Sequence, residues 1–488
     1  CQAATASPAA AEQPPDAASD VSGADGIAAS VVIAASVVIA ADAMSVTAIL
    51  GAAELESDVP KMSLEHRLTT LDSGLRIVTE RMPSVRSVSL GFWIGTGSRT
   101  ESEGEAGLSH LLEHLLFKGS SKYASLEIDQ IFDAMGAEIN AGTGKEATSV
   151  YARVLGEHLP RAFDVMSDMV LRPSLVEIDA EREVILEEIA MYEDDPQEKV
   201  FDVLGGAIFG THPLGRAIIG YAPVIAQTPA AEIAQFHSAR YNPGNIVIAA
   251  AGAVDHEQLV QLAASADRKP RLAESVTAQA ALTMPPAGAQ VLRFERKDTE
   301  QFHICLGAVG LSRHDERRFA MRLLDTIFGG ASSSRLFQEV RERYGLAYSV
   351  YSFTSAYHDT GQVGLYVGTR SENAEEAMRV VAGEVHRMRT EAATAEELHR
   401  AKENLKGRVL LALESTGSRM SRLGSDVLAD ARMLDLEEVI RRIDAVTRDD
   451  LQVLAEEFWD PTRLSAAGIG PDEARFQSAI AKLEVAAA

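Results

Sequence analysis

Residues 107–118 constrain this chain more than any other stretch, because they are almost wholly apolar yet carry two histidines and a glutamate. Their sequence, Gly-Leu-Ser-His-Leu-Leu-Glu-His-Leu-Leu-Phe-Lys, predicts a helix. Helical spacing places His110, Glu113 and His114 on one face, one turn apart. Burying a carboxylate between two imidazoles is costly unless a partner compensates, and a metal ion is the natural partner. The pattern therefore favours a metal site over a polar stripe on an ordinary helix.

Two histidines one turn apart supply half of a tetrahedral zinc site, so His110 and His114 are predicted ligands. The order His-x-x-Glu-His is the inverted form of the zinc-peptidase signature. In this arrangement Glu113 can act as a general base toward water held by the metal.

A third ligand is needed, and the helix predicted over residues 179–192 offers four glutamates. Glu181 and Glu188 fall on one stripe, whereas Glu183 and Glu187 share a more polar side. Glu188 is the predicted ligand because its neighbours one turn away are all apolar: Val184, Ile185, Met191 and Tyr192. Glu181, two turns earlier on the stripe, is predicted to orient a histidine from outside the ligand shell. A structural ion pair would produce the same periodicity.

These motifs resemble the insulinase/pitrilysin-type zinc peptidases, and most closely their bacterial and mitochondrial-processing-peptidase group. The resemblance rests on His110-Leu-Leu-Glu-His114 and on Glu188 within a Glu-Arg-x-x-Ile-x-x-Glu context. It extends over nearly all of residues 62–488. Further passages fit the same family: residues 136–141, 211–216 and 241–252.

The resemblance implies further site residues. The strand around Asn140 and Ala141 is expected to accept the substrate as an added strand. Arg341 and Tyr348 match the arginine and tyrosine that bind the substrate backbone and stabilise the tetrahedral intermediate. In the family, two-domain chains pair into a chamber and the arginine and tyrosine come from the opposite chain. Since this chain carries both sets, the resemblance predicts a homodimer with sites completed in trans.

The second half of the sequence echoes the first. Residues 302–313 resemble residues 88–99, and both segments end in Ser-Arg. The helix predicted over residues 317–328 takes the place of the metal helix without its motif. We expect an α+β fold of two homologous domains, each a mainly antiparallel sheet covered by helices. The predicted parts are a leader (1–61), a catalytic zinc domain (62–264), a linker (265–290) and a non-metal domain carrying Arg341 and Tyr348 (291–488).

The leader is rich in Ala, Ser and Pro and repeats a short apolar segment at residues 27–38. Three interpretations fit it. Cys1 would bear lipid in a processed lipoprotein; residues 26–41, extended to 53, would anchor the chain in a membrane; or the leader is dispensable or not natively translated. The last is favoured, which predicts a cytoplasmic protein and leaves a membrane-anchored one as the alternative.

The charge balance limits the partners. The chain has 71 acidic and 46 basic residues, for a net charge of −25, which argues against nucleic acid and favours basic peptides. With only Cys1 and Cys305, a cysteine zinc cluster is excluded. The sequence thus predicts a zinc-dependent endopeptidase with one Zn²⁺ per chain, although the ligand set also tolerates cobalt or manganese. The alternative is a non-catalytic assembly subunit of the same fold, in which motif residues are typically lost.

Overall fold

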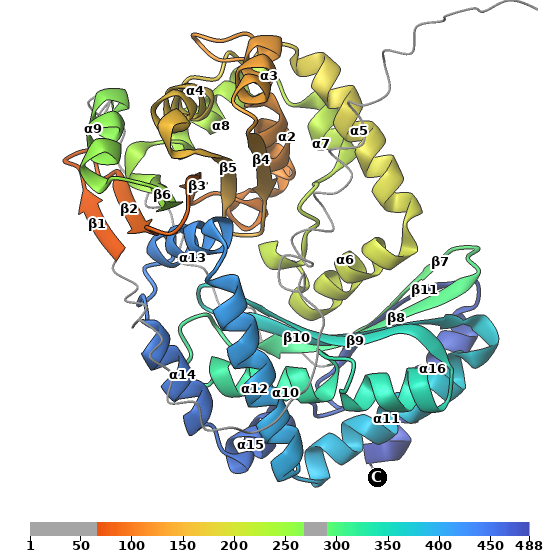
Figure 1. Ribbon diagram of the computed structural model, residues 1–488. Helices are drawn as coiled ribbons and strands as arrows, with labels where there is room; N and C mark the ends of the chain where they lie inside the picture. The colour runs from red at the N-terminus through yellow and green to blue at the C-terminus, as the bar shows by residue number, and fades with distance from the viewer. Residues whose placement is uncertain (1–65, 268–289, 488) are drawn as a thin grey trace, which may run out of the picture. The chain divides into compact units, whose positions relative to one another are not determined.

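The computed structural model of this protein describes residues 66–267 and 290–487 (Figure 1). The predicted leader, residues 1–61, lies outside the described residues, and so does nearly all of the predicted linker 265–290. The limits predicted for the two domains stay a prediction.

The N-terminal half contains a six-stranded sheet in the order β1-β2-β6-β3-β5-β4. Its central strands β3 and β6 are apolar along most of their length because both faces of the sheet are covered there. Strand β4 lies at one edge and pairs with β5. The strands are β1 His66–Thr70, β2 Arg76–Arg81, β3 Ser87–Ile94, β4 Glu138–Thr143, β5 Thr148–Leu155 and β6 Ile246–Gly252.

The helices of this half follow β3, β5 and β6 along the chain. They are α2 Leu108–Leu115, α3 Ser125–Ala134, α4 Leu159–Leu171, α5 Ile178–Asp194, α6 Pro196–Phe209, α7 Ala222–Gln227, α8 Ala230–Arg240 and α9 His256–Ala266. A core of buried aliphatic and aromatic side chains joins α2 and α4 to strands β3 and β5.

The C-terminal half contains a five-stranded sheet in the order β7-β11-β8-β10-β9. Its strands are β7 Leu292–Arg296, β8 Gln301–Gly310, β9 Ala347–Ala356, β10 Gly361–Arg370 and β11 Ser465–Gly470. Its helices are α10 Arg318–Phe328, α11 Ala374–Thr390, α12 Ala395–Ala412, α13 Thr416–Leu428, α14 Leu436–Ala445, α15 Arg448–Phe458 and α16 Glu473–Ala487, with a π-helical segment, η6, at Phe337–Arg343.

The two sheets repeat one topology. Without β1, the order β2-β6-β3-β5-β4 matches β7-β11-β8-β10-β9 strand for strand. In each sheet the first two of these strands are parallel and the remaining pairs are antiparallel. Helix α10 lies between β8 and β9, as α2 lies between β3 and β4. The predicted α+β class with two mainly antiparallel sheets is confirmed.

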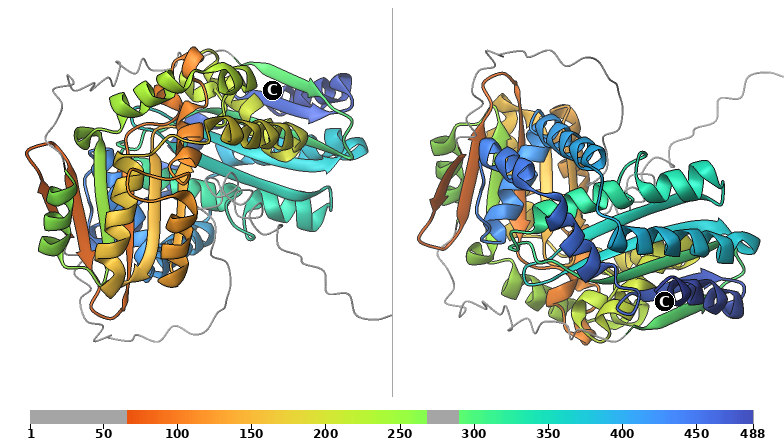
Figure 2. Two further views of the ribbon diagram at one scale, coloured as in Figure 1. Left: turned by 90° about the horizontal axis from the view of Figure 1, so that it is seen from above. Right: turned by 90° about the horizontal axis from the view of Figure 1, so that it is seen from below.

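One helix from each half packs on the sheet of the other half. Helix α13 packs on β2, β3 and β6 of the N-terminal sheet, and α6 packs on β7, β8 and β11 of the C-terminal sheet. Figure 2 shows α13, in blue, beside the strands of the N-terminal half. A buried ion cluster fixes α13 there, because both Arg419 and Arg422 pair with Glu80 of β2. Helices α12 and α13 are thus close neighbours in sequence, and the second covers the sheet of the other half.

Among the described residues, no helix combines the length and apolarity that a bilayer crossing requires.

Candidate metal centre

Helix α2 is amphipathic in the way its sequence predicts. Leu108, Leu111, Leu112 and Leu115 are buried in the core of the N-terminal half. The imidazoles lie on another face and keep a small exposed fraction, 12% for the side chain of His110 and 14% for that of His114. The aliphatic face fixes the helix against the sheet, so the histidines occupy fixed positions.

The start of α2 is held by a residue that sequence reasoning missed. The carboxylate of buried Glu101 accepts hydrogen bonds from the backbone N–H of Gly107 at 2.9 Å and of Ser109 at 2.7 Å. It thereby satisfies two of the N–H groups that a helix leaves unpaired at its first turn. Glu101 lies outside the usual N-cap spacing, so no local sequence signal marks it.

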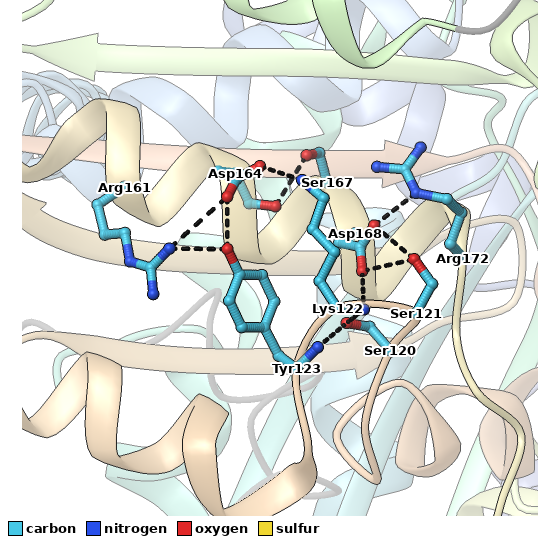
Figure 3. Close-up of polar contacts among 9 residues, drawn as sticks. All are labelled: Ser120, Ser121, Lys122, Tyr123, Arg161, Asp164, Ser167, Asp168 and Arg172. Carbon is cyan, nitrogen blue, oxygen red and sulfur yellow. Dashed lines mark hydrogen bonds and ion pairs between the residues drawn. The ribbon is translucent and has the colours of Figure 1, made fainter.

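The loop after α2 is anchored on α4 by two aspartates (Figure 3). The carboxylate of buried Asp168 accepts from the hydroxyl of Ser121, the backbone N–H of Lys122 and the guanidinium of Arg172. One turn earlier, Asp164 pairs with Lys122 and accepts from the hydroxyl of Tyr123. These bonds fix the chain at the end of the metal helix, before α3 begins.

The structure brings the three predicted ligands together. One candidate ligand atom from each of His110, His114 and Glu188 lies within 4.8 Å of the others. The Nε2 atom of His110 is 3.8 Å from Oε1 of Glu188, and Nε2 of His114 is 3.6 Å from its Oε2. Within the described residues this is the only such group of three or more His, Cys, Asp or Glu side chains.

The donor set fits zinc. Two imidazole nitrogens and one carboxylate oxygen are a common protein contribution to a catalytic zinc site that keeps a further position open. Burial, with the nearby His114, lowers the pKa of His110 to about 3, so its imidazole is neutral, as a ligand must be. Burial also raises the pKa of Glu188, a cost that a bound cation offsets.

The choice of Glu188 over Glu187 agrees with the structure, but part of its basis was wrong. Val184 and Met191, predicted to be buried neighbours, are 47% exposed. The buried stripe of α5 runs instead through Glu181 and Ile185, both buried, to half-buried Glu188. The helix packs on α2, α6 and α7 along this narrow stripe, so apolar residues beside it remain in solvent.

Glu181 lies where a carboxylate orienting a histidine is expected. Its Oε2 is 3.3 Å from Nδ1 of His114, and its Oε1 is 2.6 Å from Nζ of Lys118. Burial opposes ionisation, but the hydrogen bonds from His114 and Lys118 outweigh it and lower the pKa of Glu181. An ionised Glu181 keeps the proton of His114 on Nδ1 and leaves Nε2 free for a metal. Sequence reasoning missed Lys118, although it is one turn from His114.

Glu113 is held beside the ligands and is only 4% exposed. Burial raises its pKa to about 7, against the hydrogen bond that the hydroxyl of Thr143 donates to its Oε2. A carboxyl with a pKa near neutrality can both accept and return a proton.

The strand predicted to bind the substrate, β4, lies at an edge of its sheet. Asn140 and Ala141 lie on β4, whose pairing among the described residues is with β5 alone. Asn140 accepts a hydrogen bond from the backbone N–H of Ala141 at 2.8 Å, and β4 packs on α2. An edge strand beside the metal helix is the geometry that strand addition needs, and the role of these two residues stays a prediction.

Arg341 and Tyr348 lie together in the C-terminal half. The guanidinium carbon of Arg341, in η6, is 4.4 Å from the ring centroid of Tyr348, and its Nη1 donates to the Tyr348 carbonyl at 3.2 Å. Tyr348 lies on edge strand β9 and is 76% exposed. The guanidinium of Arg341 also lies over the ring of Phe337 and pairs with Glu342. The metal ligands lie in the other half of the chain.

Comparison with known proteins identifies the family. Residues 76–222 match the family model described as Insulinase (Peptidase family M16), and residues 229–405 match Peptidase M16 inactive domain. An uncharacterised zinc protease of Streptomyces coelicolor is 43% identical over 83% of this chain and 89% of its own length. The chain belongs to the insulinase family of peptidases.

Other relatives of this chain are also named zinc proteases. An uncharacterised zinc protease of Mycobacterium tuberculosis is 41% identical, over 84% of this chain and 94% of its own length. The Bacillus subtilis zinc protease YmxG, also uncharacterised, is 38% identical over 80% of this chain and 95% of its own.

Solved structures show the same fold. A protease from Helicobacter pylori superposes with a TM-score of 0.76 at 21% identity, covering 83% of this chain and 99% of the other. A peptidase M16 inactive domain from Pseudomonas fluorescens superposes with a TM-score of 0.75 at 22% identity, covering 84% and 99%.

Proposed function

We propose that this protein is a zinc-dependent endopeptidase that cleaves peptides or unfolded protein segments. The observation that carries the proposal is the convergence of His110, His114 and Glu188 beside a buried Glu113. Membership of a peptidase family, with relatives named zinc proteases, supports it. The alternative, a non-catalytic assembly subunit, is disfavoured because all four motif residues are present in the sequence.

His110, His114 and Glu188 would hold one zinc ion per chain, while Glu181 orients His114. A bound zinc ion supplies Lewis-acid chemistry, polarising the scissile carbonyl and acidifying water. Glu113 takes the proton from the attacking water and delivers it to the leaving amine. Its pKa of about 7 suits both transfers. The edge strand β4, with Asn140 and Ala141, aligns the peptide backbone by pairing with it.

Arg341 and Tyr348 complete the site from a second copy of the chain. The support is their position: Tyr348 is exposed on edge strand β9 of the second sheet, and half-buried Arg341 lies beside it in η6. A phenol and a guanidinium can donate hydrogen bonds to a developing oxyanion. We therefore propose a homodimer whose two chains enclose the substrate in a chamber, which admits short or unstructured chains. The net charge of −25 favours basic peptides.

The test is hydrolysis of a quenched basic peptide by the wild-type chain and by Glu113→Gln, each with and without a chelator. We expect the variant to bind zinc as the wild type does, yet to lose about 10²- to 10⁴-fold in kcat, since a general base is removed. The chelator should abolish wild-type activity, and added zinc should restore it.

Two neighbouring glutamates on α5 provide the metal control. Glu188→Gln should lose zinc, whereas Glu187→Gln, exposed on the same helix, should retain both zinc and activity. Full activity of Glu113→Gln would reject Glu113 as the base, and activity that survives complete zinc removal would reject a zinc-dependent mechanism. A wild-type chain that binds neither zinc nor peptide would support the assembly subunit.

A further inference from the structure

Glu113 is held by a hydroxyl that the proposed chemistry has not used. Oγ1 of Thr143 donates to Oε2 of Glu113 at 2.5 Å, and both residues are buried, with 5% and 4% of their surfaces exposed. Thr143 ends strand β4, which packs on α2. The bond therefore joins the candidate substrate strand to the candidate catalytic base.

The direction of this hydrogen bond follows from its surroundings. Thr143 lies opposite Thr148 of β5, with their hydroxyl oxygens 3.5 Å apart. Thr148 donates its own hydrogen to the carbonyl of Thr96 at 2.9 Å. The Thr143 hydroxyl hydrogen is thus left to Glu113, which accepts it as a carboxylate. A hydrogen bond to an ionised acceptor is stronger and better aligned than a neutral one.

The turn after Thr143 is clamped from two sides. The carbonyls of Gly144 and Lys145 accept from the backbone N–H groups of Ser98 and Arg99, at 3.2 and 2.7 Å. The carboxylate of Glu146 accepts from the guanidinium of Arg99 at 2.7 Å and from the backbone N–H of His358, in the C-terminal half. The end of β4 is thus fixed, and so is the hydroxyl that it presents.

We propose that Thr143 is a positioning residue for Glu113, and this inference rests on the proposed peptidase function. The hydroxyl holds Oε2 and fixes the carboxylate orientation, which leaves Oε1 as the oxygen that exchanges a proton with water and the leaving amine. A displacement of a base by about 1 Å can cost about 10²-fold in rate, so a fixed orientation has a large effect. Simple core packing would explain the burial of Thr143 but not a hydroxyl directed at the one carboxylate that must act.

The variants Thr143→Val and Thr143→Ser separate hydrogen bonding from packing. Thr143→Val keeps the shape and loses the donor, and we expect kcat to fall about 10- to 100-fold with KM and zinc content near wild type. Thr143→Ser keeps the donor and should recover most of the activity. Thr326→Val is the matched control, because Thr326 is a buried threonine on α10 whose hydroxyl bonds a backbone carbonyl, and its kcat should stay at the wild-type level.

A thermal-unfolding cycle tests the contact without relying on activity. Thr143→Val, Glu113→Ala and the double variant are compared in the zinc-loaded protein. If Thr143 holds Glu113, the loss of Tm caused by Thr143→Val is smaller in the Glu113→Ala background.

Three results would overturn the inference: losses of Tm that simply add, an unchanged kcat in Thr143→Val, or equal losses of kcat in the Val and Ser variants. If the wild-type chain cleaves no peptide, the proposed peptidase function fails separately, and the unfolding cycle alone decides whether Thr143 holds Glu113.

Discussion

Glu113 and Glu181 are two buried glutamates of one site whose pKa values shift in opposite directions. Burial dominates for Glu113 and raises its pKa to about 7. For Glu181 the hydrogen bonds from His114 and Lys118 outweigh burial, and the pKa falls. The environment thus suits one carboxyl to proton transfer and keeps the other charged, which is the division of roles that acid–base sites require.

Glu181→Gln should weaken zinc binding. The amide cannot keep a negative charge on the Nδ1 side of His114, so we expect about a 10- to 100-fold rise in the Kd for zinc. Competition with a chromophoric chelator measures this directly. Glu183→Gln is the control, because Glu183 lies on the exposed side of the same helix. Equal zinc affinity in Glu181→Gln and the wild type would exclude Glu181 from this role.

At this scale the sequence predicted the residues whose spacing is regular. His110, Glu113 and His114 share one turn of α2, and Glu181 and Glu188 share a stripe of α5, so a helical period identifies both groups. The contacts of Glu101 and Thr143 were not predicted, because each residue reaches α2 from a different segment of the chain. A hydrogen bond between segments leaves no period in the sequence.

At the scale of elements, α2 depends on a glycine at its start. Gly107 precedes the helix with φ of 96°, in the left-handed region that side chains other than glycine rarely adopt. A Cβ there would lie 2.6 Å from the carbonyl oxygen of Ile219 and 3.0 Å from Cα of Gly220. The entry of the metal helix therefore leaves no room for a side chain.

Gly107→Ala should destabilise the protein by about 1–3 kcal/mol through backbone strain alone, with the steric contact adding to it. Denaturant unfolding measures the loss. We also expect weaker zinc binding, because the helix start must shift to relieve the contact. Gly104→Ala, three residues earlier, has open space around its Cβ and should be near neutral. A fully stable Gly107→Ala would show that the turn tolerates a side chain.

Most strands and helices were predictable at this scale, because each carries its own pattern. The helices α5 and α10 fall close to the ranges predicted for them, 179–192 and 317–328. The boundary between α12 and α13 carries no such pattern, because the short turn at Glu414 and Ser415 that separates them lacks glycine and proline. Helical periodicity alone does not show that the chain changes direction there.

At the scale of the whole molecule, the metal ligands and the Arg341–Tyr348 pair lie on separate halves. In the described part of the chain each sheet ends in an edge strand, β4 beside the metal helix and β9 beside η6. An edge strand is open to pairing with another chain. This arrangement is what a site completed by two copies requires.

Complementation tests the dimer. Glu113→Gln and Tyr348→Phe chains should each be nearly inactive. If sites are completed in trans, refolding them together yields mixed dimers in which one of the two sites is intact, with about a quarter of wild-type activity after random pairing. Mixing Glu113→Gln with Glu188→Gln is the control. Both substitutions affect the metal centre, so in a mixed dimer each of the two metal centres is damaged and no intact site forms. A mixture of the first pair without recovered activity would contradict completion in trans.

The relationship between the two halves, a repeated topology with one helix of each packed on the other sheet, could be predicted only in part. The echo between residues 88–99 and 302–313 revealed the repeated topology, since both segments form the third strand of the common order. The exchange of α6 and α13 could not be predicted, because an apolar helix face does not state which sheet it covers. In the sequence, Glu80, Arg419 and Arg422 are indistinguishable from surface charges, and only the fold brings them together.

The exchange of α13 has a consequence for how the protein is made. Strand β6 completes the N-terminal sheet at Gly252, but the helix that covers Val78, Val247 and Ala249 is residues 416–428. A ribosome therefore exposes an apolar sheet face while most of the second half is still being translated. Chains released early would present that apolar face to one another and aggregate. We therefore expect that synthesis of the full-length chain depends on chaperones that bind nascent chains.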